Sequence, residues 1–277
     1  MSDLPASPFQ PDLLSGQVAF VTGGGTGIGK EICRVLGRHG ASIAIASRKQ
    51  EVLEAAALEL GAEGIATWVH PCDVRDAPAV AGVVDGIIER FGRLDIVVNN
   101  AAGNFPAPMS RISPNGFKTI VDIDLLGSYN VSKAAFGAWL RDHGGNIVNI
   151  TAPFELKGAA LQAHVAAAKA GVDSLTRTCA VEWGRFGIRV NAIAPGHIGG
   201  TEGVRRFAAA VPDPAVSVRP RNPLGVIGHG SDIAHVTLFL CSPAARFVSG
   251  QVIAVDGGGS SDLLKLDLAS LDPDDAG

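Results

Sequence analysis

Short apolar segments alternate with longer segments of helical periodicity along most of the chain. The apolar segments have the length of buried strands, and the longer ones repeat apolar residues at the spacing of one helix face. This alternation predicts strands at residues 18–21, 42–46, 65–70, 94–98, 146–150, 188–193 and 251–255. It predicts helices at residues 28–39, 49–60, 77–91, 114–141, 161–183 and 231–240, with Ser231 as the N-cap of the last.

A repeated strand–helix–strand order requires right-handed crossovers and a parallel sheet with helices on both faces. The predicted fold class is therefore α/β, a single-domain Rossmann-type doubly wound parallel sheet flanked by helices. Residues 17–260 form this domain, residues 1–16 are expected to be a flexible lead-in, and residues 261–277 are an acidic tail. Residues 195–230 are rich in proline and glycine without a clear period, so they are expected to be a mobile substrate-side insertion.

The composition and net charge of the chain indicate which binding partners are not expected. The chain is 47% hydrophobic, 18% charged and 5% aromatic, as in a protein with an aliphatic core, and its net charge of -4 predicts no nucleic-acid or anionic-membrane partner. No apolar stretch approaches the roughly 18 residues of a membrane span. The four cysteines form no CxxC pair, so neither a metal site nor a disulfide framework is predicted. The final residues Asp-Asp-Ala-Gly are not a peroxisomal address, so a cytoplasmic location is expected.

A glycine-rich segment directly follows the first predicted strand and opens the first predicted helix. Its residues are Thr22, Gly23, Gly24, Gly25, Thr26, Gly27, Ile28 and Gly29. Glycines in this context permit a tight turn and let the backbone approach a pyrophosphate at the helix N-terminus. A simple turn is the alternative, but the strand–helix context favours a nucleotide site.

The end of the second strand bears on which nucleotide is bound. Proteins of this fold that bind NAD usually place an acidic residue here to accept the ribose 2′-hydroxyl. This chain has Ser47, Arg48 and Lys49 instead. A hydroxyl and two cations suit a 2′-phosphate, so NADP is the predicted cofactor. The alternative is that Arg48 and Lys49 merely open a surface helix.

Four motifs occur in the order and spacing of the short-chain dehydrogenase/reductase superfamily, which the chain resembles from about Gln17 to Gly259. They are the glycine-rich segment, Asp73-Val74, the Asn-Asn-Ala-Ala-Gly segment at 99–103, and Pro195-Gly196. The resemblance implies that Asp73 and Val74 border the adenine. It also implies that the adenosine ribose is lined by Asn100, Ala101, Ala102 and Gly103, and that the nicotinamide side is contacted by Pro195, Gly196 and Ile198.

The catalytic positions depart from the superfamily's pattern. Members usually donate a proton from a tyrosine and hold the nicotinamide ribose with a lysine four residues later. Lys169 matches the lysine, but Val165 stands at the tyrosine, Ala152 at the usual serine and Asp124 at the usual asparagine. The only tyrosine, Tyr129, comes too early in the chain to serve. Carbonyl reduction through a tyrosine acid is therefore not expected.

One branch of the superfamily, the peroxisomal type of 2,4-dienoyl-CoA reductase, shares these replacements. The chain resembles it in long strings at residues 101–105, 121–124, 141–145, 148–152, 180–184 and 200–203. The resemblance implies hydride transfer from NADPH to a 2,4-dienoyl-CoA and formation of a 3-enoyl-CoA. By the same resemblance Asp124 and Lys169, ionised and paired, would hold the water that supplies the proton, and Lys169 would also grip the nicotinamide ribose.

An acyl-CoA substrate needs an apolar channel and cations for its phosphates. Candidate substrate-side residues are Asn104, Phe105, Thr151, Phe154, His164, Arg205 and Arg206. Asn104 and Phe105 either line the acyl channel or pack in an ordinary loop. His164 is expected to form a pocket wall or to be a satisfied structural histidine. A helix turns about 100° per residue, so His164 points away from position 165 and is not expected to be the proton donor. Arg219 and Arg221, further along the same segment, are also candidates for the phosphates. For all four arginines the alternative is surface solubility.

Two other functions stay open at this point. The chain could be another tyrosine-less short-chain reductase that acts on a different activated alkene or carbonyl. It could also be an inactive NADP-binding scaffold or sensor, although an inactive site has no evident use for Asp124 beside Lys169. Superfamily members usually pair through the two long helices, so the resemblance implies a homodimer or homotetramer.

Overall fold

Parallel pairing holds the strands of the protein in one sheet. The computed structural model describes residues 7, 9–154, 158–210 and 222–261. Within these residues the sheet has seven strands in the order β3-β2-β1-β4-β5-β6-β7, and all neighbouring pairs are parallel. The strands are β1 (Val18–Thr22), β2 (Ser42–Ser47), β3 (Thr67–Pro71), β4 (Ile96–Asn99), β5 (Gly145–Ile150), β6 (Ile188–Pro195) and β7 (Val252–Val255).

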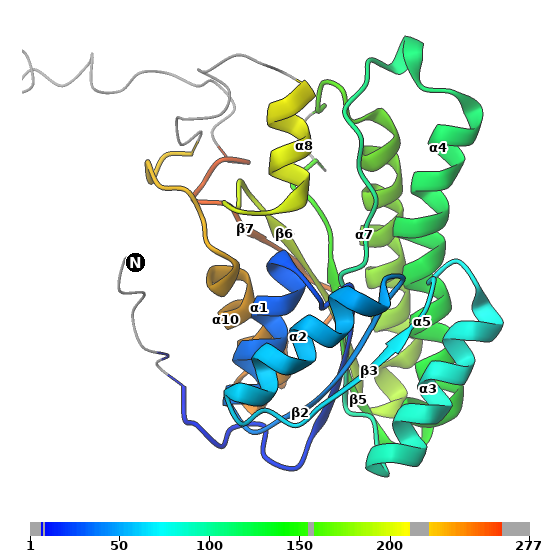
Figure 1. Ribbon diagram of the computed structural model, residues 1–277, viewed down its shortest axis with the longest axis vertical. Coiled ribbons are helices and arrows are strands. Elements are labelled where there is room, and N and C mark those ends of the chain that lie inside the picture. Colours follow the sequence, from blue (N-terminus) through cyan, green and yellow to red (C-terminus); the bar gives the residue numbers. More distant parts are fainter. Residues whose placement is uncertain (1–6, 8, 155–157, 211–221, 262–277) are drawn as a thin grey trace, which may run out of the picture.

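Helices cover both faces of the sheet, as Figure 1 shows. One face carries α1 (Gly27–Arg38), α2 (Gln50–Ala62) and α10 (Gly230–Cys241). The other carries α3 (Ala77–Phe91), α4 (Pro114–Val121), α5 (Gly127–Ala135), α6 (Arg141–His143) and α7 (Ala163–Trp183). α8 (Glu202–Ala210) and short 3-10 turns at Met109–Arg111, Gly184–Phe186 and Pro243–Ala245 complete the elements. The doubly wound α/β fold predicted from the sequence is confirmed.

The strands are apolar on both sides because both of their faces are buried. Successive side chains of a strand point to opposite faces, so neighbours enter different cores. In β1, Val21 packs in the core under α1 and α10, whereas Phe20 packs in the core under α3 and α5. All five residues of β1 are buried. Continuous apolar runs are the pattern expected of such a sheet.

All four cysteines are buried and unpaired. Burial raises the pKa of the Cys72 and Cys179 thiols to about 11 and that of Cys241 to about 12. It raises the pKa of Cys33 further still. The thiols therefore serve as small apolar core residues.

The helix predicted over residues 114–141 has the expected extent but is not regular. Two π-helical turns, Asp122–Leu126 and Phe136–Leu140, separate α4 from α5 and α5 from α6. A π turn widens the helix locally and is common at functional sites. Residue periodicity gives no signal for it, because the apolar face continues on both sides of the turn.

Several expected boundaries need correction. The last helix is capped by His229, not by Ser231: the imidazole accepts from Ser231 N while Asp232 Oδ2 accepts from His229 N. The segment 195–230 contains helix α8, which its glycine and proline content had concealed, and residues 211–221 lie outside the described part. Of the expected lead-in, residues 9–16 form packed turns: Leu14 is fully buried and its N–H donates to His39 O over 2.8 Å. The acidic tail lies outside the described residues from 262 onward.

Among the helices of the described residues, none is both long enough and apolar enough to cross a bilayer.

Candidate active site

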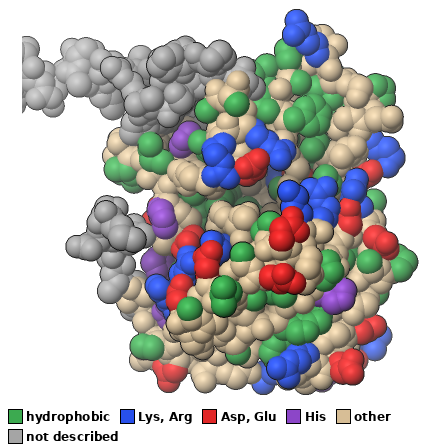
Figure 2. Space-filling view, viewed as in Figure 1, with side chains coloured by type: hydrophobic (Ala, Val, Ile, Leu, Met, Phe, Trp, Pro, Cys, Tyr) green, Lys and Arg blue, Asp and Glu red, His purple; other side chains and the backbone are tan. Residues whose placement is uncertain are grey.

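The residues predicted to bind the cofactor converge on one cavity at the carboxyl edge of the sheet. The cavity has a volume of about 360 Å³ and lies where strand order diverges between β1 and β4, the position at which doubly wound sheets bind ligands. Figure 2 shows a hollow on this face with basic and acidic side chains around it. The predicted cofactor residues that line the cavity are Gly23, Thr26, Gly27, Ile28, Gly29, Ser47, Arg48, Asp73, Val74, Asn100, Ala101 and Ala102.

Other predicted cofactor residues do not line this cavity. They are Thr22, Gly25, Lys49, Gly103, Lys169, Pro195, Gly196 and Ile198. Conversely, the beginning of α8 and the residue before it contribute Thr201, Glu202, Gly203 and Arg206 to the wall. Sequence reasoning assigned Arg206 to the substrate and missed the other three, although they belong to the string 200–203 that carried the family likeness.

The glycines of the first loop leave room for a dinucleotide. Gly23 and Gly27 have φ of 66° and 53°, a left-handed conformation that favours glycine. A Cβ on Gly27 would meet nothing closer than Thr201 Cγ2 at 3.9 Å, so the loop surface is open toward the cavity. A Cβ on Gly29 would lie 2.4 Å from Asn100 Nδ2 and 2.6 Å from Gly23 O. The loop therefore fits a pyrophosphate on its open side and packs tightly on the other.

Thr22 and Asn100 hold two loops of the cavity together. The Thr22 hydroxyl accepts from the N–H groups of Asn100 and Ala101, each over 3.0 Å. Asn100 Nδ2 donates to Thr22 O over 3.0 Å and to Gly23 O over 3.2 Å. Thr22 is buried, so its side chain acts by positioning the loops.

Charged groups lie at the end of the cavity formed by β2 and β3. Arg48 lines the cavity, whereas Lys49 is the residue before α2 and does not. Asp73 is held by the guanidinium of Arg75, with Nη2 to Oδ2 at 2.6 Å. The hydrogen bonds from Arg75 hold the pKa of the Asp73 carboxyl below its usual range. Asp73 is thus an ionised acceptor whose partner is Arg75. At this end of the cavity, Arg48 is the lining cation that could bind an anionic group.

Asp124 and Lys169 form a buried pair beneath this region. Lys169 Nζ lies 3.5 Å from Asp124 Oδ2 and donates to Ile150 O over 2.8 Å. Asp124 Oδ1 accepts from Gly103 N over 2.7 Å, while Oδ2 has no hydrogen-bond partner among the described residues. Asp124 is fully buried and Lys169 nearly so. One carboxylate oxygen and one ammonium group are therefore available to the same small polar molecule.

The π turn sets the position of Asp124. Asp124 lies inside the turn Asp122–Leu126, and the Ser128 hydroxyl donates to Asp124 O over 2.7 Å. Gly127 directly after the turn packs against Val74, where a Cβ would come within 2.5 Å of Val74 Cγ2. The widened turn and this close packing direct the carboxylate inward from an otherwise apolar stretch.

No hydroxyl occupies the position of the superfamily's tyrosine. Val165 is buried in an apolar cluster with Ile120 and Ala168. Thr151 is buried, and its hydroxyl donates to Lys169 O over 3.3 Å. Tyr129 lies on α5, and its hydroxyl accepts from Lys133 Nζ over 3.1 Å. The site therefore combines a carboxylate and an ammonium group without a phenol.

The sequence and structure were compared with known proteins. The family model described as enoyl-(acyl carrier protein) reductase matches residues 23–260. The chain belongs to the short-chain dehydrogenase/reductase family. Curated relatives include the peroxisomal 2,4-dienoyl-CoA reductase [(3E)-enoyl-CoA-producing] of Rattus norvegicus, 49% identical over 90% of this chain and 86% of the relative. The protein of the same name from Arabidopsis thaliana is 46% identical over 91% of this chain and 87% of the relative.

Solved structures of a dehydrogenase and a ketoreductase resemble this fold closely. A citronellol catabolism dehydrogenase from Pseudomonas aeruginosa PAO1 superposes with a TM-score of 0.81 and 39% identity, covering 92% of this chain and 99% of that one. An actinorhodin polyketide ketoreductase solved with NADPH gives a TM-score of 0.83 at 29% identity, covering 88% and 97%. The family and this NADPH-bound neighbour support a nicotinamide cofactor.

The expected cytoplasmic location is contradicted by these relatives. The reductases from animals, a plant and yeast are all named as peroxisomal, which points to a peroxisome rather than the cytoplasm. The expectation rested on the last residues of the chain. A location depends on an address read by a receptor, and neither the fold nor the active site of a short-chain reductase encodes it.

The apolar residues predicted to lie on the substrate side pack together near the Asp124–Lys169 pair. Phe105 and Phe154 pack against the cluster that contains Val165. The ring of His164 lies 4.3 Å from the ring of Phe105, centroid to centroid. Asn104 has a buried side-chain oxygen without a hydrogen-bond partner in the described chain. An apolar wall with polar groups at its edge suits an acyl thioester.

The two arginines of α8 differ in position. Arg206 lines the cofactor cavity, donates to Asn104 O over 3.0 Å and pairs with Glu202 Oε1 at 2.9 Å. Arg205 pairs with Glu202 Oε2 at 2.8 Å and caps Gly200 O, outside the cavity wall. Arg206 thus connects the α8 segment to the loop after β4. Two further arginines considered for the CoA phosphates, Arg219 and Arg221, lie outside the described residues.

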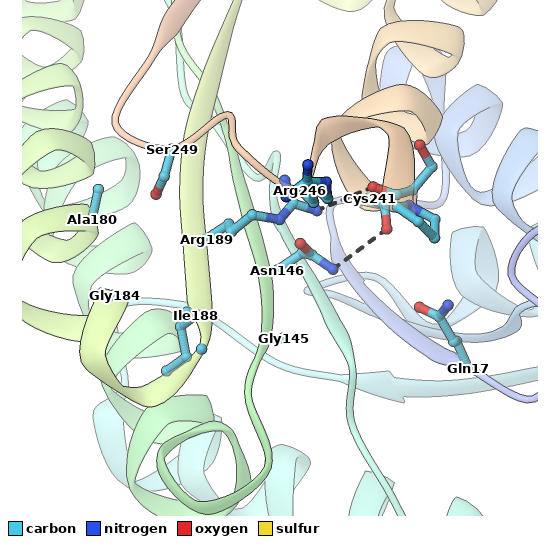
Figure 3. Close-up of a pocket in the computed structure, with 13 residues that line it drawn as sticks. Gln17, Gly145, Asn146, Ala180, Gly184, Ile188, Arg189, Cys241, Arg246 and Ser249 are labelled. Carbon is cyan, nitrogen blue, oxygen red and sulfur yellow. Dashed lines mark hydrogen bonds between the residues drawn. The ribbon is translucent and has the colours of Figure 1, made fainter.

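A second cavity lies at the opposite, amino-terminal edge of the sheet (Figure 3). Its volume is about 540 Å³, and it contains Arg189 and Asn146, from the starts of β6 and β5. Arg189 donates to Ser242 O and Val248 O over 3.4 and 3.3 Å, so it satisfies carbonyls that follow α10. No predicted site residue lines this cavity. Nor do the described residues contain a cluster of three or more His, Cys, Asp or Glu side chains able to hold a metal ion.

Proposed function

We propose that the chain catalyses the NADPH-dependent reduction of 2,4-dienoyl-CoA thioesters to 3-enoyl-CoA. The observation that carries the proposal is the buried pair Asp124–Lys169 next to Val165, which stands where the family's tyrosine would be. The relatives named as (3E)-enoyl-CoA-producing reductases, 46–49% identical for the two described above, support the same reaction.

The reaction explains why a phenol is unnecessary. When bound, NADPH supplies a hydride, which adds to C5 of the dienoyl thioester. The resulting dienolate carries its charge largely on the thioester oxygen and takes its proton at C2. Because the proton goes to carbon and not to an alkoxide, a positioned water can supply it.

Asp124 and Lys169 have the geometry to position such a water. Lys169 Nζ can donate to it, and Asp124 Oδ2, the oxygen without a partner, can accept from it. Lys169 Nζ is also the cationic group beside this buried carboxyl, 3.5 Å from Asp124 Oδ2. The second role of Lys169, a contact to the nicotinamide ribose, rests on the family likeness.

The experiment for this function mixes purified chain with NADPH and a 2,4-dienoyl-CoA. We expect NADPH absorbance to fall and the product to be a 3-enoyl-CoA by mass spectrometry and NMR. A 2-enoyl-CoA and a 3-ketoacyl-CoA serve as comparisons for other activated alkenes and carbonyls. NADPH oxidation only with a comparison substrate would assign another reductase, and NADPH binding without any oxidation would assign a scaffold or sensor.

The adenosine end of the site is proposed to select NADP over NAD through Ser47 and Arg48, which line the cavity where Asp73 is already paired with Arg75. Replacing Arg48 by alanine removes a charge-assisted hydrogen bond of about 1.5–3 kcal/mol. We expect the KM for NADPH to rise roughly 10- to 100-fold and the KM for NADH to change little. Steady-state kinetics with both cofactors test this, with Arg90→Ala on the exposed side of α3 as the control. An equal change for NADPH and NADH would contradict the assignment.

We also propose a domain organisation and an assembly for this reductase. Residues 17–260 form one reductase domain, and the chain assembles as a homodimer or homotetramer through α4–α6 and α7. Apolar side chains on these helices support the assembly, since Leu126 and Tyr129 are about 40% exposed and Val181 is 84% exposed. A contact with a second copy of the chain would cover these side chains.

A further inference from the structure

Buried polar side chains without partners gather at the beginning of α7. His164 is fully buried, and neither of its ring nitrogens makes a well-formed hydrogen bond to a described residue. Gln162, two residues earlier, is 5% exposed, and its Nε2 also lacks a partner in the described chain. Buried polar groups are nearly always hydrogen-bonded in proteins, so two exceptions at one place indicate a missing ligand.

The helix end itself adds further donors. The first helical hydrogen bond of α7 runs from Ala166 N to Gln162 O over 2.8 Å. The Gln162 side chain does not cap the helix. The N–H groups of residues 163–165 therefore lie at an uncapped helix N-terminus, where the helix dipole also favours a negative charge.

The backbone before the helix is held in a strained conformation. Leu161 has φ of 66° and is the one non-glycine residue with positive φ in the described part of the chain. Its carbonyl accepts from Ala107 N over 3.0 Å, which fixes the helix start to the loop after β4. Strained backbone of this kind clusters at ligand sites, where the surrounding structure holds it.

The loop after β4 connects this helix end to the catalytic carboxylate. Gly103 N donates to Asp124 Oδ1, and two residues later the ring of Phe105 packs on His164. Burial lowers the pKa of His164, while the Phe105 backbone and the charge of Asp124 act more weakly in the opposite direction. His164 is therefore a neutral imidazole with one N–H to donate, because its contact with the Phe105 backbone does not have the geometry of a hydrogen bond.

We infer that His164, Gln162 and the N-terminal end of α7 bind the carbonyl oxygen of the substrate's thioester and hold its charge when the dienolate forms. The inference rests on the proposed function. In that reaction hydride forms the new bond at C5, the C4–C5 pair moves to C3–C4, and the C2–C3 pair moves to C1–C2. The carbonyl pair then rests on oxygen until C2 takes a proton from the water and the carbonyl reforms. The hydroxide left behind takes a proton from the Lys169 ammonium group, which regains one from solvent as the product leaves.

The geometry of the substrate fits this assignment. C1, which carries the oxygen, is bonded directly to C2, the atom that is protonated. The oxygen subsite must therefore lie next to the group that protonates C2, and the loop 103–105 makes Asp124 and His164 neighbours in this way. C5 is four bonds from C1, so the subsite is separate from the position at which hydride enters.

The test compares His164→Leu with His164→Gln, because leucine removes the donor and glutamine retains one. A dienoyl-CoA bound together with NADP⁺ cannot react, and its absorption band moves to longer wavelength when its carbonyl accepts a hydrogen bond. We expect the wild type to show this displacement and His164→Leu to lose most of it. We expect kcat/KM for the dienoyl-CoA to fall on the order of 10²-fold in His164→Leu, with partial recovery in His164→Gln and an unchanged Kd for NADPH.

The controls separate binding from packing. Circular dichroism and melting curves verify the fold, and His143→Leu replaces an exposed histidine that stacks on Trp139. A wild-type band displacement retained in a folded His164→Leu variant would overturn the subsite. Equal loss of activity in His164→Gln and His164→Leu would also overturn it, because that result would show that His164 acts only by packing. Absence of NADPH oxidation by the wild type with any dienoyl-CoA instead contradicts the proposed function.

Discussion

Replacing Lys169 by alanine is expected to lower kcat/KM for a 2,4-dienoyl-CoA by at least ~10³-fold, the scale seen when a group acting on the transition state is lost. Lys169 Nζ is the charged partner of Asp124 Oδ2, and both side chains are buried. Without the ammonium group the carboxylate loses its partner, and the water between them loses its donor. Breaking a buried pair in this way also costs about 3–5 kcal/mol of stability.

Asp124→Asn tests the other half of the pair. The amide has nearly the same shape but cannot attract the ammonium group as a carboxylate does, so we expect a comparable loss. Because the two residues act on one water, the double variant should be little worse than either single variant. Stopped-flow measurement of NADPH oxidation gives the chemical step, and Arg90→Ala on the exposed side of α3 is the control. Undiminished turnover in Lys169→Ala would remove the pair from the mechanism.

Replacing Gly29 by alanine is expected to weaken NADPH binding by roughly 100-fold or more and to lower the melting temperature. A Cβ there would lie 2.4 Å from Asn100 Nδ2 and 2.6 Å from Gly23 O, and Gly23 O is backbone that cannot rotate away. Relief requires the first loop to move off Asn100, which also holds Thr22 O. Overpacking of this kind typically costs about 1–3 kcal/mol, and it distorts the surface proposed to hold the pyrophosphate.

Gly61→Ala provides a matched control for this glycine. Gly61 lies in α2, and a Cβ there would meet nothing within 4 Å. Alanine in a helix is favoured over glycine by roughly 0.5–1 kcal/mol, so this variant should be slightly more stable than the wild type. Fluorescence titration with NADPH and thermal melting measure both variants. Equal cofactor affinity in Gly29→Ala and the wild type would contradict the packing argument.

The parts of the fold that were predictable from sequence are those with strong local signals. Phe20 and Val21 lie in a continuous apolar run, and such a run followed by glycines predicts a buried strand and a phosphate-binding turn. Helix α8 was missed because proline and glycine around it suppress the helical signal. The cap at His229 was missed because serine is a common N-cap residue and histidine is a rare one, so the sequence pointed to Ser231.

The candidate site shows the same division. Asp124 and Lys169 were paired through the resemblance to the reductase branch, and the structure places Lys169 Nζ 3.5 Å from Asp124 Oδ2. The sequence could not show that Glu202 lines the cofactor cavity, because α8 meets the first loop only in the folded chain. The lack of partners for Gln162 and His164 is likewise a property of burial. A sequence shows that a side chain is polar, but not whether water or a protein group reaches it.

The buried cysteines determine how the protein responds to oxidants. Oxidation and alkylation proceed through the thiolate, and burial keeps all four thiols protonated, with the pKa of the Cys72 and Cys179 thiols at about 11. The folded chain therefore presents no readily reactive thiolate to hydrogen peroxide or to a maleimide. Labelling of Cys33, Cys179 or Cys241 then reports opening of the core, whereas Cys72 lines the cavity at the carboxyl edge of the sheet.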